Sequence, residues 1–293
     1  MNTVTFSGRR KFRIGDTPII RRRAVERIFG VSHLLIKDES RNHYGTLKDR
    51  RNRAAISRAM QEHVDKLVLI TSGNCGYSLA RLAEGSGIRV VCFIDKAIGN
   101  YIKERLRKYA HDVIEIDLGS KIYHSEDLLA LARETKDEVI WDVTNGYHVA
   151  FQDIVGEIET ENPDLLIVPL GSGEAYVGLY EGLSRYRMNT KLLGVGVHEM
   201  RGNTLILREK PSIADKLHTP FTPYRRRIEA ILEEGHLYTQ LSDAEIADAY
   251  EKIHLLIQCE PSSAAAFAAL SEIDVKKYRK IIVVNSGRGI WEA

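Results

Sequence analysis

The chain has 293 residues, which is enough for one large domain or, more naturally, for two lobes with a real core. With 44% hydrophobic and 28% charged residues, its composition excludes the disordered, collagen-like and low-complexity classes. A formal net charge of only +2, with lysines and arginines spread along the chain, argues against nucleic acid as a partner.

The first predicted element is an extended segment at Thr17 to Ile20, because proline biases the residue before it away from helix. A short helix ending at Gly30 and a buried strand at Leu34 to Ile36 follow. Thr46 is well placed to cap the next helix, with Asp49 three residues on, which is the reciprocal pattern of a capping box.

From here short apolar runs alternate with amphipathic helices, which predicts a mostly parallel sheet covered on both faces. Residues 199–222 lack a clear period and are predicted to be an irregular connection. Ser242 and Glu245 predict a capped helix start. The predicted strands comprise residues 67–70, 90–94, 113–116, 138–141, 165–168, 192–197 and 281–284.

Two glycine-rich loops lie between a predicted strand and a predicted helix, where a doubly wound sheet binds its ligands. In the loop from Ser72 to Gly76, backbone amides at the helix start suit a carboxylate. In Gly171-Ser172-Gly173 they suit a phosphate held by main-chain donors. Neither loop has the spacing of a dinucleotide fingerprint or a P-loop, and each alone is also consistent with a purely structural turn.

Lys48 adds a reactive group to these loops. A lysine in the first turn of a helix feels the positive end of the helix dipole, which disfavours the ammonium form. A neutral amine can form a Schiff base with an aldehyde cofactor. The alternative is an exposed helix lysine, which is the common state of this residue type.

Several segments together resemble the fold type II pyridoxal-phosphate enzymes, the group of tryptophan synthase β, cysteine synthase, threonine synthase and serine/threonine dehydratase. The resemblance extends from about Thr17 to Gly289, nearly the whole chain. The segments follow one another in the family's order: residues 37–50 with the lysine, 71–76 as the asparagine loop, 168–173 as the phosphate loop, 260–265 as a late helix start and 285–289 as the turn that meets the pyridine ring.

The resemblance implies a role for each matching residue. Lys48 would be the Schiff-base lysine and proton shuttle, Asn74 would hydrogen-bond the cofactor's phenolic oxygen, and Ser286 would hydrogen-bond the pyridine nitrogen. A hydroxyl there leaves that nitrogen mostly unprotonated, which suits elimination or replacement. The phosphate of pyridoxal 5'-phosphate would lie in the loop formed by Gly171, Ser172, Gly173 and Glu174, and the substrate carboxylate would be bound by Ser72, Gly73, Cys75 and Gly76, with Thr46 beside them.

The sequence departs from the family pattern at a few positions. Tyr44 and the bulky Cys75-Gly76-Tyr77 are expected to reshape the substrate side. Glu174 would repel the cofactor phosphate unless its carboxylate points away. Residues 145–148 lack the arginine and glutamine that threonine synthases tend to show there.

The resemblance implies an α/β protein with two lobes of doubly wound, mostly parallel sheet and the cofactor in the cleft between them. Residues 1–45 and 146–293 would form the larger lobe, and residues 46–145 the smaller, mobile lobe with Lys48. The expected activity is elimination or replacement on a serine-, threonine- or homoserine-type amino acid, with threonine-synthase-like chemistry first and cysteine-synthase-like replacement or serine/threonine deamination next. A cofactor-binding regulatory protein without turnover and a nucleotide-binding module remain alternatives.

Compartment and assembly follow from weaker signals. The N-terminal residues up to Arg13 lack the apolar core of a signal peptide and are expected to lie over the main body, and no apolar run reaches the ~20 residues of a membrane span. The three cysteines and ten histidines show no disulfide or zinc spacing. We expect a cytoplasmic enzyme without a metal, and the family suggests a homodimer.

Overall fold

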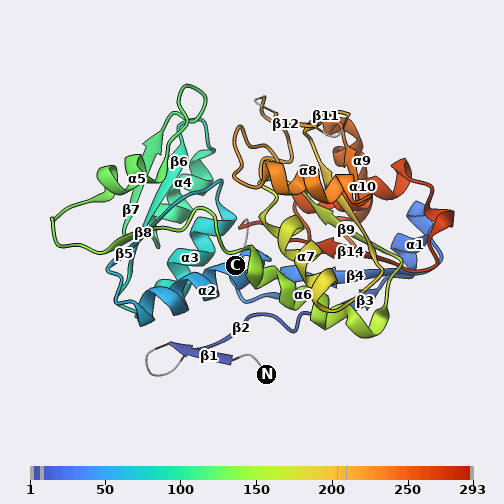
Figure 1. The fold of residues 1–293 in the computed structure, drawn as a ribbon, viewed down its shortest axis with the longest axis horizontal. Coiled ribbons are helices and arrows are strands. Elements are labelled where there is room, and N and C mark those ends of the chain that lie inside the picture. Colours follow the sequence, from blue (N-terminus) through green and yellow to red (C-terminus); the bar gives the residue numbers. More distant parts are fainter. Residues whose placement is uncertain (1–2, 7–9, 203, 209, 291–293) are drawn as a thin grey trace. The chain divides into compact units, whose positions relative to one another are not determined.

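The computed structural model describes residues 3–6, 10–202, 204–208 and 210–290. The chain divides into two compact units, and each is described by itself. Unit 1 comprises Met1–Ile14, Asn42–Tyr147 and Ile290–Ala293, and unit 2 comprises Gly15–Arg41 and His148–Gly289. Figure 1 labels most elements of both units.

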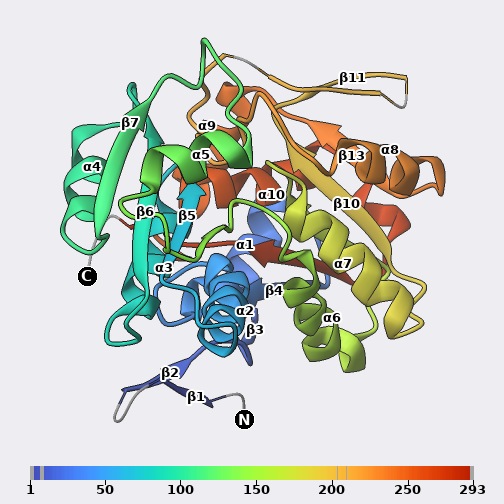
Figure 2. The same cartoon turned by 60° about the vertical axis from the view of Figure 1, so that its left-hand side comes forward.

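Unit 1 is built on a four-stranded parallel sheet in the order β7-β6-β5-β8, and Figure 2 shows β7, β6 and β5 side by side. Alternate residues of β5 enter two cores: Leu67 and Leu69 pack with α2 and α3, whereas Val68 packs with α5. Its elements are α2 (Lys48–Gln61), β5 (Lys66–Ile70), α3 (Asn74–Ala83), β6 (Arg89–Asp95), α4 (Asn100–Arg107), β7 (Asp112–Ile116), α5 (Ser125–Ala132) and β8 (Ile140–Asp142).

The N-terminus of unit 1 forms an antiparallel hairpin of β1 (Thr3–Phe6) and β2 (Arg10–Arg13), which the sequence did not predict. Ile14 follows the hairpin and is buried in the core of unit 1, and its carbonyl accepts a hydrogen bond of 2.9 Å from Arg53 Nη1. These contacts group residues 1–14 with unit 1, whereas the sequence assigned them to the larger lobe. The lobe boundaries predicted after residues 45 and 145 stay a prediction.

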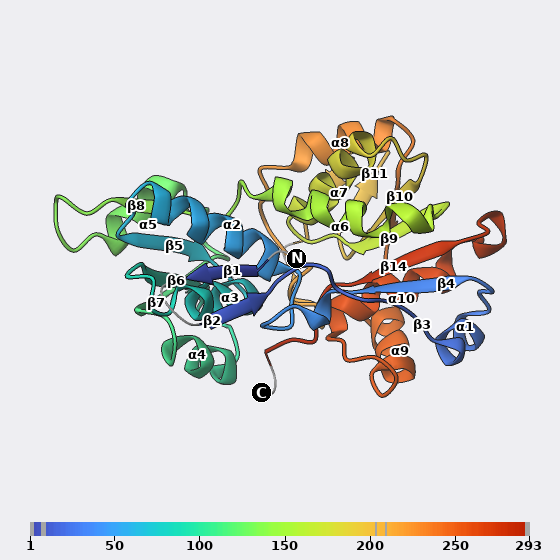
Figure 3. The same cartoon turned by 90° about the horizontal axis from the view of Figure 1, so that it is seen from below.

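Unit 2 contains a six-stranded sheet in the order β13-β10-β9-β14-β4-β3. Every pair is parallel except the pair of β3 and β4. Figure 3 shows α6, α7 and α8 on one side of this sheet and α1, α9 and α10 on the other.

The elements of unit 2 have the following bounds: β3 (Ile19–Arg21), α1 (Arg23–Phe29), β4 (Leu34–Asp38), α6 (Gln152–Ile158), β9 (Leu165–Pro169), α7 (Glu174–Arg185), β10 (Lys191–Gly196), β11 (Glu199–Arg201), β12 (Thr204–Ile206), α8 (Arg225–Glu233), β13 (Leu237–Gln240), α9 (Asp243–Ile253), α10 (Pro261–Glu272) and β14 (Ile281–Asn285).

The predicted α/β class with a mostly parallel sheet is confirmed, and β14 lies inside its sheet as expected of a buried apolar strand. The capping box at Ser242 is confirmed as well, since Ser242 Oγ accepts from the Glu245 amide at 3.3 Å. Residues 199–222, predicted to be irregular, contain the β11–β12 hairpin, and edge strand β13 was missed. Within the described residues, none of the helices combines the length and the apolar character needed to span a bilayer.

Candidate functional site

Lys48 is the first residue of α2, and its side chain is half-buried. The predicted capping box is wrong, because Leu47 is the N-cap and makes no side-chain cap bond. The fully buried Asp49 carboxylate instead accepts from the Tyr44 amide at 2.6 Å and from Ser78 Oγ at 2.6 Å. The carboxylate therefore joins the turn before Lys48 to α3, rather than closing its own helix.

Buried polar side chains hold the first turns of α2 and α3 together. Asn52 Nδ2 donates to the Cys75 carbonyl at 2.9 Å, and Arg51 Nη1 lies 2.8 Å from Cys75 Sγ. Both residues of α2 are fully buried. Lys48 and Asn74 consequently start two helices that are fixed to each other within unit 1. Sequence reasoning missed these residues because a run of charged residues at a helix start usually faces solvent.

The asparagine loop is ordered by Thr71, whose Oγ1 accepts the amides of Gly73 and Gly76 at 3.0 Å each. Gly73 is the N-cap of α3 at φ 130°, a conformation that favours glycine. Over the described ranges, no group accepts a hydrogen bond from the amides of Ser72 and Cys75. Since both amides lie at the positive end of a helix, they can bind a carboxylate.

The loop before α7 has the same design in unit 2. Its N-cap Gly173 has φ 83°. A Cβ on Gly171 would lie 2.4 Å from the Lys216 carbonyl oxygen, and one on Gly173 would lie 2.3 Å from Ile228 Cδ1, so neither position admits a side chain without rearrangement. No described residue accepts from the amides of Ser172, Gly173 and Ala175. A tight, glycine-walled loop with unengaged amides at a helix start fits a phosphate group.

Glu174 is the first residue of α7, and its carboxylate contacts a tyrosine hydroxyl. Its side chain is buried, and Oε1 lies 3.5 Å from the Tyr224 hydroxyl. The Tyr224 ring meets the ring of His148 edge to face at 5.6 Å, and burial lowers the pKa of His148. The carboxylate is thus directed at the Tyr224 hydroxyl, and a cofactor contact from Glu174 would come from its main-chain amide.

Ser286 follows β14 directly and is almost fully buried. Its Oγ lies 2.7 Å from Oγ of Ser263, in the first turn of α10. The strand end before it is fixed by Asn285, whose Nδ2 donates to Asp38 Oδ1 at 2.8 Å. Unit 2 therefore holds the predicted phosphate loop and the predicted pyridine partner on one sheet, after β9 and β14.

The two bulky departures from the family pattern pack against each other. Tyr44 and Tyr77 are both buried in the core of unit 1, with ring centroids 6.0 Å apart in an edge-to-face contact. The Tyr44 hydroxyl donates to the Arg81 carbonyl at 3.2 Å, and burial raises the pKa of Tyr44. The expectation that these rings reshape the substrate side stays a prediction, and within unit 1 they fill space between the turn at 42–45 and α3. Cys75 remains half-exposed.

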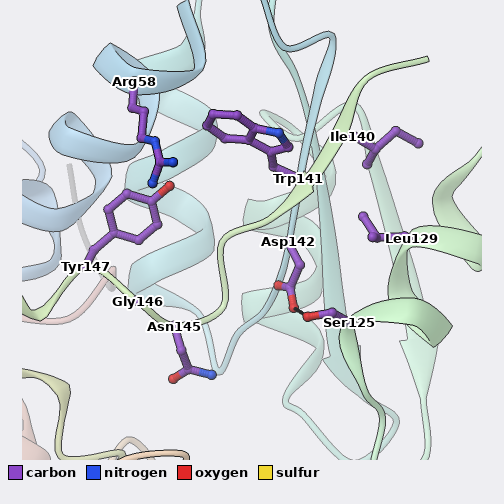
Figure 4. A pocket seen from close by; sticks show the side chains of 9 residues that line it. All are labelled: Arg58, Ser125, Leu129, Ile140, Trp141, Asp142, Asn145, Gly146 and Tyr147. Carbon is purple, nitrogen blue, oxygen red and sulfur yellow. Dashed lines mark hydrogen bonds between the residues drawn. The ribbon is translucent and has the colours of Figure 1, made fainter. Parts of the chain in front are cut away.

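Unit 1 also has a pocket of about 390 Å³ beside β8, which the sequence did not predict. Figure 4 shows the Arg58 guanidinium next to the Trp141 ring, at 5.0 Å from its centroid. Asp142 accepts from Ser125 and, at 2.6 Å, from Thr144 Oγ1, which in turn accepts the Ile70 amide at 3.0 Å. Asp142, which lines the pocket, is thus linked through Thr144 to the end of β5, just before the asparagine loop.

Comparison with characterised proteins agrees with this geometry. The family model described as "Pyridoxal-phosphate dependent enzyme" matches residues 11–287. The chain is similar to the threonine synthase of Halalkalibacterium halodurans, at 24% identity over 94% of this chain and 82% of the relative. It is also similar to the threonine synthase of Methanocaldococcus jannaschii, at 22% identity over 94% of this chain and 75% of the relative.

Solved structures show the same fold. Maize serine racemase matches with a TM-score of 0.77 at 20% identity, over 93% of this chain and 88% of that chain. Threonine deaminase isoform 2 of Solanum lycopersicum matches with a TM-score of 0.74 at 17% identity, over 93% of this chain and 84% of that chain. With its fold type II architecture, the chain belongs to the family of pyridoxal-phosphate dependent enzymes.

Proposed function

We propose that this protein catalyses elimination or replacement on a serine-, threonine- or homoserine-type amino acid, with a threonine-synthase-like reaction as the first candidate. Family membership supports the cofactor, and the threonine synthase relatives cover 94% of the chain. The observation that carries the proposal is the pair of glycine-capped helix starts with unengaged amides, together with a lysine at the first residue of α2.

Each unit would contribute its own contacts to the cofactor. Lys48 would bind the aldehyde carbon, and Asn74 would hydrogen-bond the phenolic oxygen. In unit 2, the amides of Ser172, Gly173 and Ala175 would hold the phosphate, with Gly171 and Glu174 completing the loop, and Ser286 would meet the ring nitrogen. When bound, pyridoxal phosphate supplies an electron sink that stabilises the charge left by a departing α-proton.

The amides of Ser72 and Cys75 would hold the substrate carboxylate, because the amides of Gly73 and Gly76 are already engaged by Thr71. Gly73 and Gly76 would contribute by leaving room for the substrate carboxylate. Thr46, two residues before Lys48, would lie beside the substrate. Once the substrate amine has displaced Lys48, the free Lys48 amine would take the α-proton of the substrate and return it to the product or the leaving group.

Assembly and compartment are part of the proposal. We infer a homodimer, as is common in this family, and a cytoplasmic location. The second inference is supported by Cys75, Cys92 and Cys259, which are all free thiols. Light scattering of the purified protein tests the first, and a monomer at micromolar concentration would contradict it.

A substrate panel tests the reaction. Serine, threonine, phosphoserine, acetylserine and phosphohomoserine are each added to the cofactor-loaded protein, and the cofactor absorbance, the released leaving group and any keto acid are measured. We expect one of them to lose its leaving group, with phosphohomoserine giving threonine or threonine giving ammonia. Bound cofactor that responds to none of them would favour a regulatory protein without turnover. Saturable nucleotide binding without cofactor binding would favour a nucleotide module.

A further inference from the structure

We propose that Ser263 is a positioning residue that sets the direction of the Ser286 hydroxyl hydrogen, so that Ser286 can meet the cofactor's ring nitrogen either as donor or as acceptor. The inference rests on the proposed function, in which Ser286 meets that nitrogen. It adds a residue that touches neither cofactor nor substrate.

The two hydroxyls lie in a buried triangle with Gly287. Ser263 is fully buried, and its Oγ lies 2.7 Å from Ser286 Oγ. The same oxygen accepts the Gly287 amide at 2.8 Å and can donate to the Gly287 carbonyl at 2.8 Å. That carbonyl has a second donor, the Glu260 amide at 3.0 Å.

Counting hydrogens gives two consistent arrangements, because Ser263 has a single hydroxyl hydrogen and two acceptors for it. In the first, Ser263 donates to Gly287, Ser286 donates to Ser263, and the outer lone pair of Ser286 is left to accept from a protonated ring nitrogen. In the second, Ser263 donates to Ser286, and Ser286 donates outward to an unprotonated ring nitrogen. The Gly287 carbonyl stays satisfied in both, since the Glu260 amide remains bonded to it.

The pair would therefore let one site stabilise both protonation states of the ring nitrogen, and Ser286 alone would not. Without Ser263, a Ser286 that accepts from the ring has no described acceptor for its own hydrogen in a buried site, which is costly. The same turn of α10 is held firmly, because Ser262 Oγ accepts the Lys216 amide at 3.2 Å.

The test measures the ring nitrogen itself. Protein loaded with pyridoxal phosphate labelled with ¹⁵N in the ring is examined by NMR, since the nitrogen shift reports the fraction of protonated ring. Because the wild-type ring nitrogen is expected to be mostly unprotonated, the readout is its protonated minority. In Ser263→Ala we expect the ratio of protonated to unprotonated ring to fall about tenfold, the effect of one buried hydrogen bond, and the resonance to move the rest of the way toward unprotonated pyridine. Ser263→Thr keeps the hydroxyl and should restore the original shift.

Ser262→Ala is the matched control, because it removes a buried hydroxyl from the same turn without touching Ser286. An unchanged nitrogen shift in Ser263→Ala, or the same change in Ser262→Ala, would overturn the role of Ser263. Should Ser263→Ala fail to fold, Ser263→Cys keeps the shape with a weaker donor and should move the resonance in the same direction. Wild-type protein that retains no labelled cofactor would instead refute the proposed function.

Discussion

Asp49 shows how a buried carboxylate can serve the site without entering it. Its oxygens accept from the Tyr44 amide and the Ser78 hydroxyl, so Asp49→Ala removes an acceptor from two buried donors. We expect a loss of about 1–3 kcal/mol in the free energy of unfolding, measured by urea denaturation. Asp248→Ala removes an exposed carboxylate paired with Lys252 and should cost less than about 0.5 kcal/mol. Equal losses in the two variants would contradict the buried role.

His198 is a second buried residue with a measurable consequence. Burial lowers the pKa of His198 from 6.5 to about 4, and its Nδ1 accepts the Arg208 amide at 2.9 Å. Between these two pH values the unfolded chain binds a proton at His198 that the folded protein does not. The contribution of His198 to the free energy of unfolding is therefore fully present above pH 6.5 and is lost as the pH falls toward 4.

We expect His198→Asn, which can still accept from Arg208, to flatten this decline in the free energy of unfolding between pH 6.5 and 4. Urea denaturation at each pH measures the slope. His33→Asn changes an exposed histidine and serves as the control. A wild-type slope in His198→Asn would show that other groups carry the decline.

At the level of single residues, the sequence allowed the prediction of groups whose chemistry is local. Lys48 and the glycines at 171 and 173 could be singled out from residue type and position beside a predicted helix, whereas Asn74 was singled out by the family resemblance, and their roles stay predictions. Asp49, Asn52 and Ser78 could not, because their partners are distant in sequence and they are polar residues that a pattern assigns to solvent. The contact between Tyr44 and Tyr77 could not be predicted for the same reason, since the two residues are distant in sequence.

At the level of elements, the start of α7 offers a sharp test of the phosphate loop. Gly171→Ala would place a methyl group 2.4 Å from the Lys216 carbonyl oxygen. We expect cofactor affinity, measured by absorbance titration, to fall at least about tenfold, the effect of about one misplaced hydrogen bond. Gly99→Ala changes a glycine at the start of a different helix, α4, where a Cβ meets nothing within 4 Å, and should retain wild-type affinity. Similar affinities in the two variants would remove the loop from the cofactor site.

The two predicted capping boxes show why element boundaries are only partly readable. Ser242 and Glu245 bond to each other because no other described partner competes with them. Thr46 and Asp49 have the same spacing, yet Asp49 bonds to the turn before it and to α3. A local sequence pattern predicts a helix cap correctly when the capping side chain has no other hydrogen-bond partner within reach. A buried side chain such as Asp49 has partners from other segments, and it bonds to those instead.

At the level of the whole molecule, alternating strands and helices predicted the α/β fold because burial on both faces of a parallel sheet produces that rhythm. The hairpins β1–β2 and β11–β12 and the edge strand β13 were missed. Strands β11, β12 and β13 have few buried residues, so they lack the continuous apolar run that marks a central strand such as β14.

Two units with separate cores should both respond to the cofactor if each contributes contacts to it. Because a ligand stabilises only the folded state that binds it, saturating pyridoxal phosphate at 100 times its dissociation constant should add about 2.7 kcal/mol to the free energy of unfolding. Inorganic phosphate at the same concentration, which suits the loop before α7 alone and should bind more weakly, should raise the unfolding midpoint less. Equal shifts from the two ligands, measured by circular dichroism, would indicate that unit 1 makes no contact.

The most direct test of the central claim identifies the residue that carries the cofactor. Protein loaded with pyridoxal phosphate is reduced with borohydride and digested, and the labelled peptide is sequenced by mass spectrometry. We predict the label on Lys48, and Lys48→Ala should retain no covalent cofactor while keeping the wild-type circular dichroism spectrum. A label on any other lysine, or undiminished labelling of Lys48→Ala, would contradict the account.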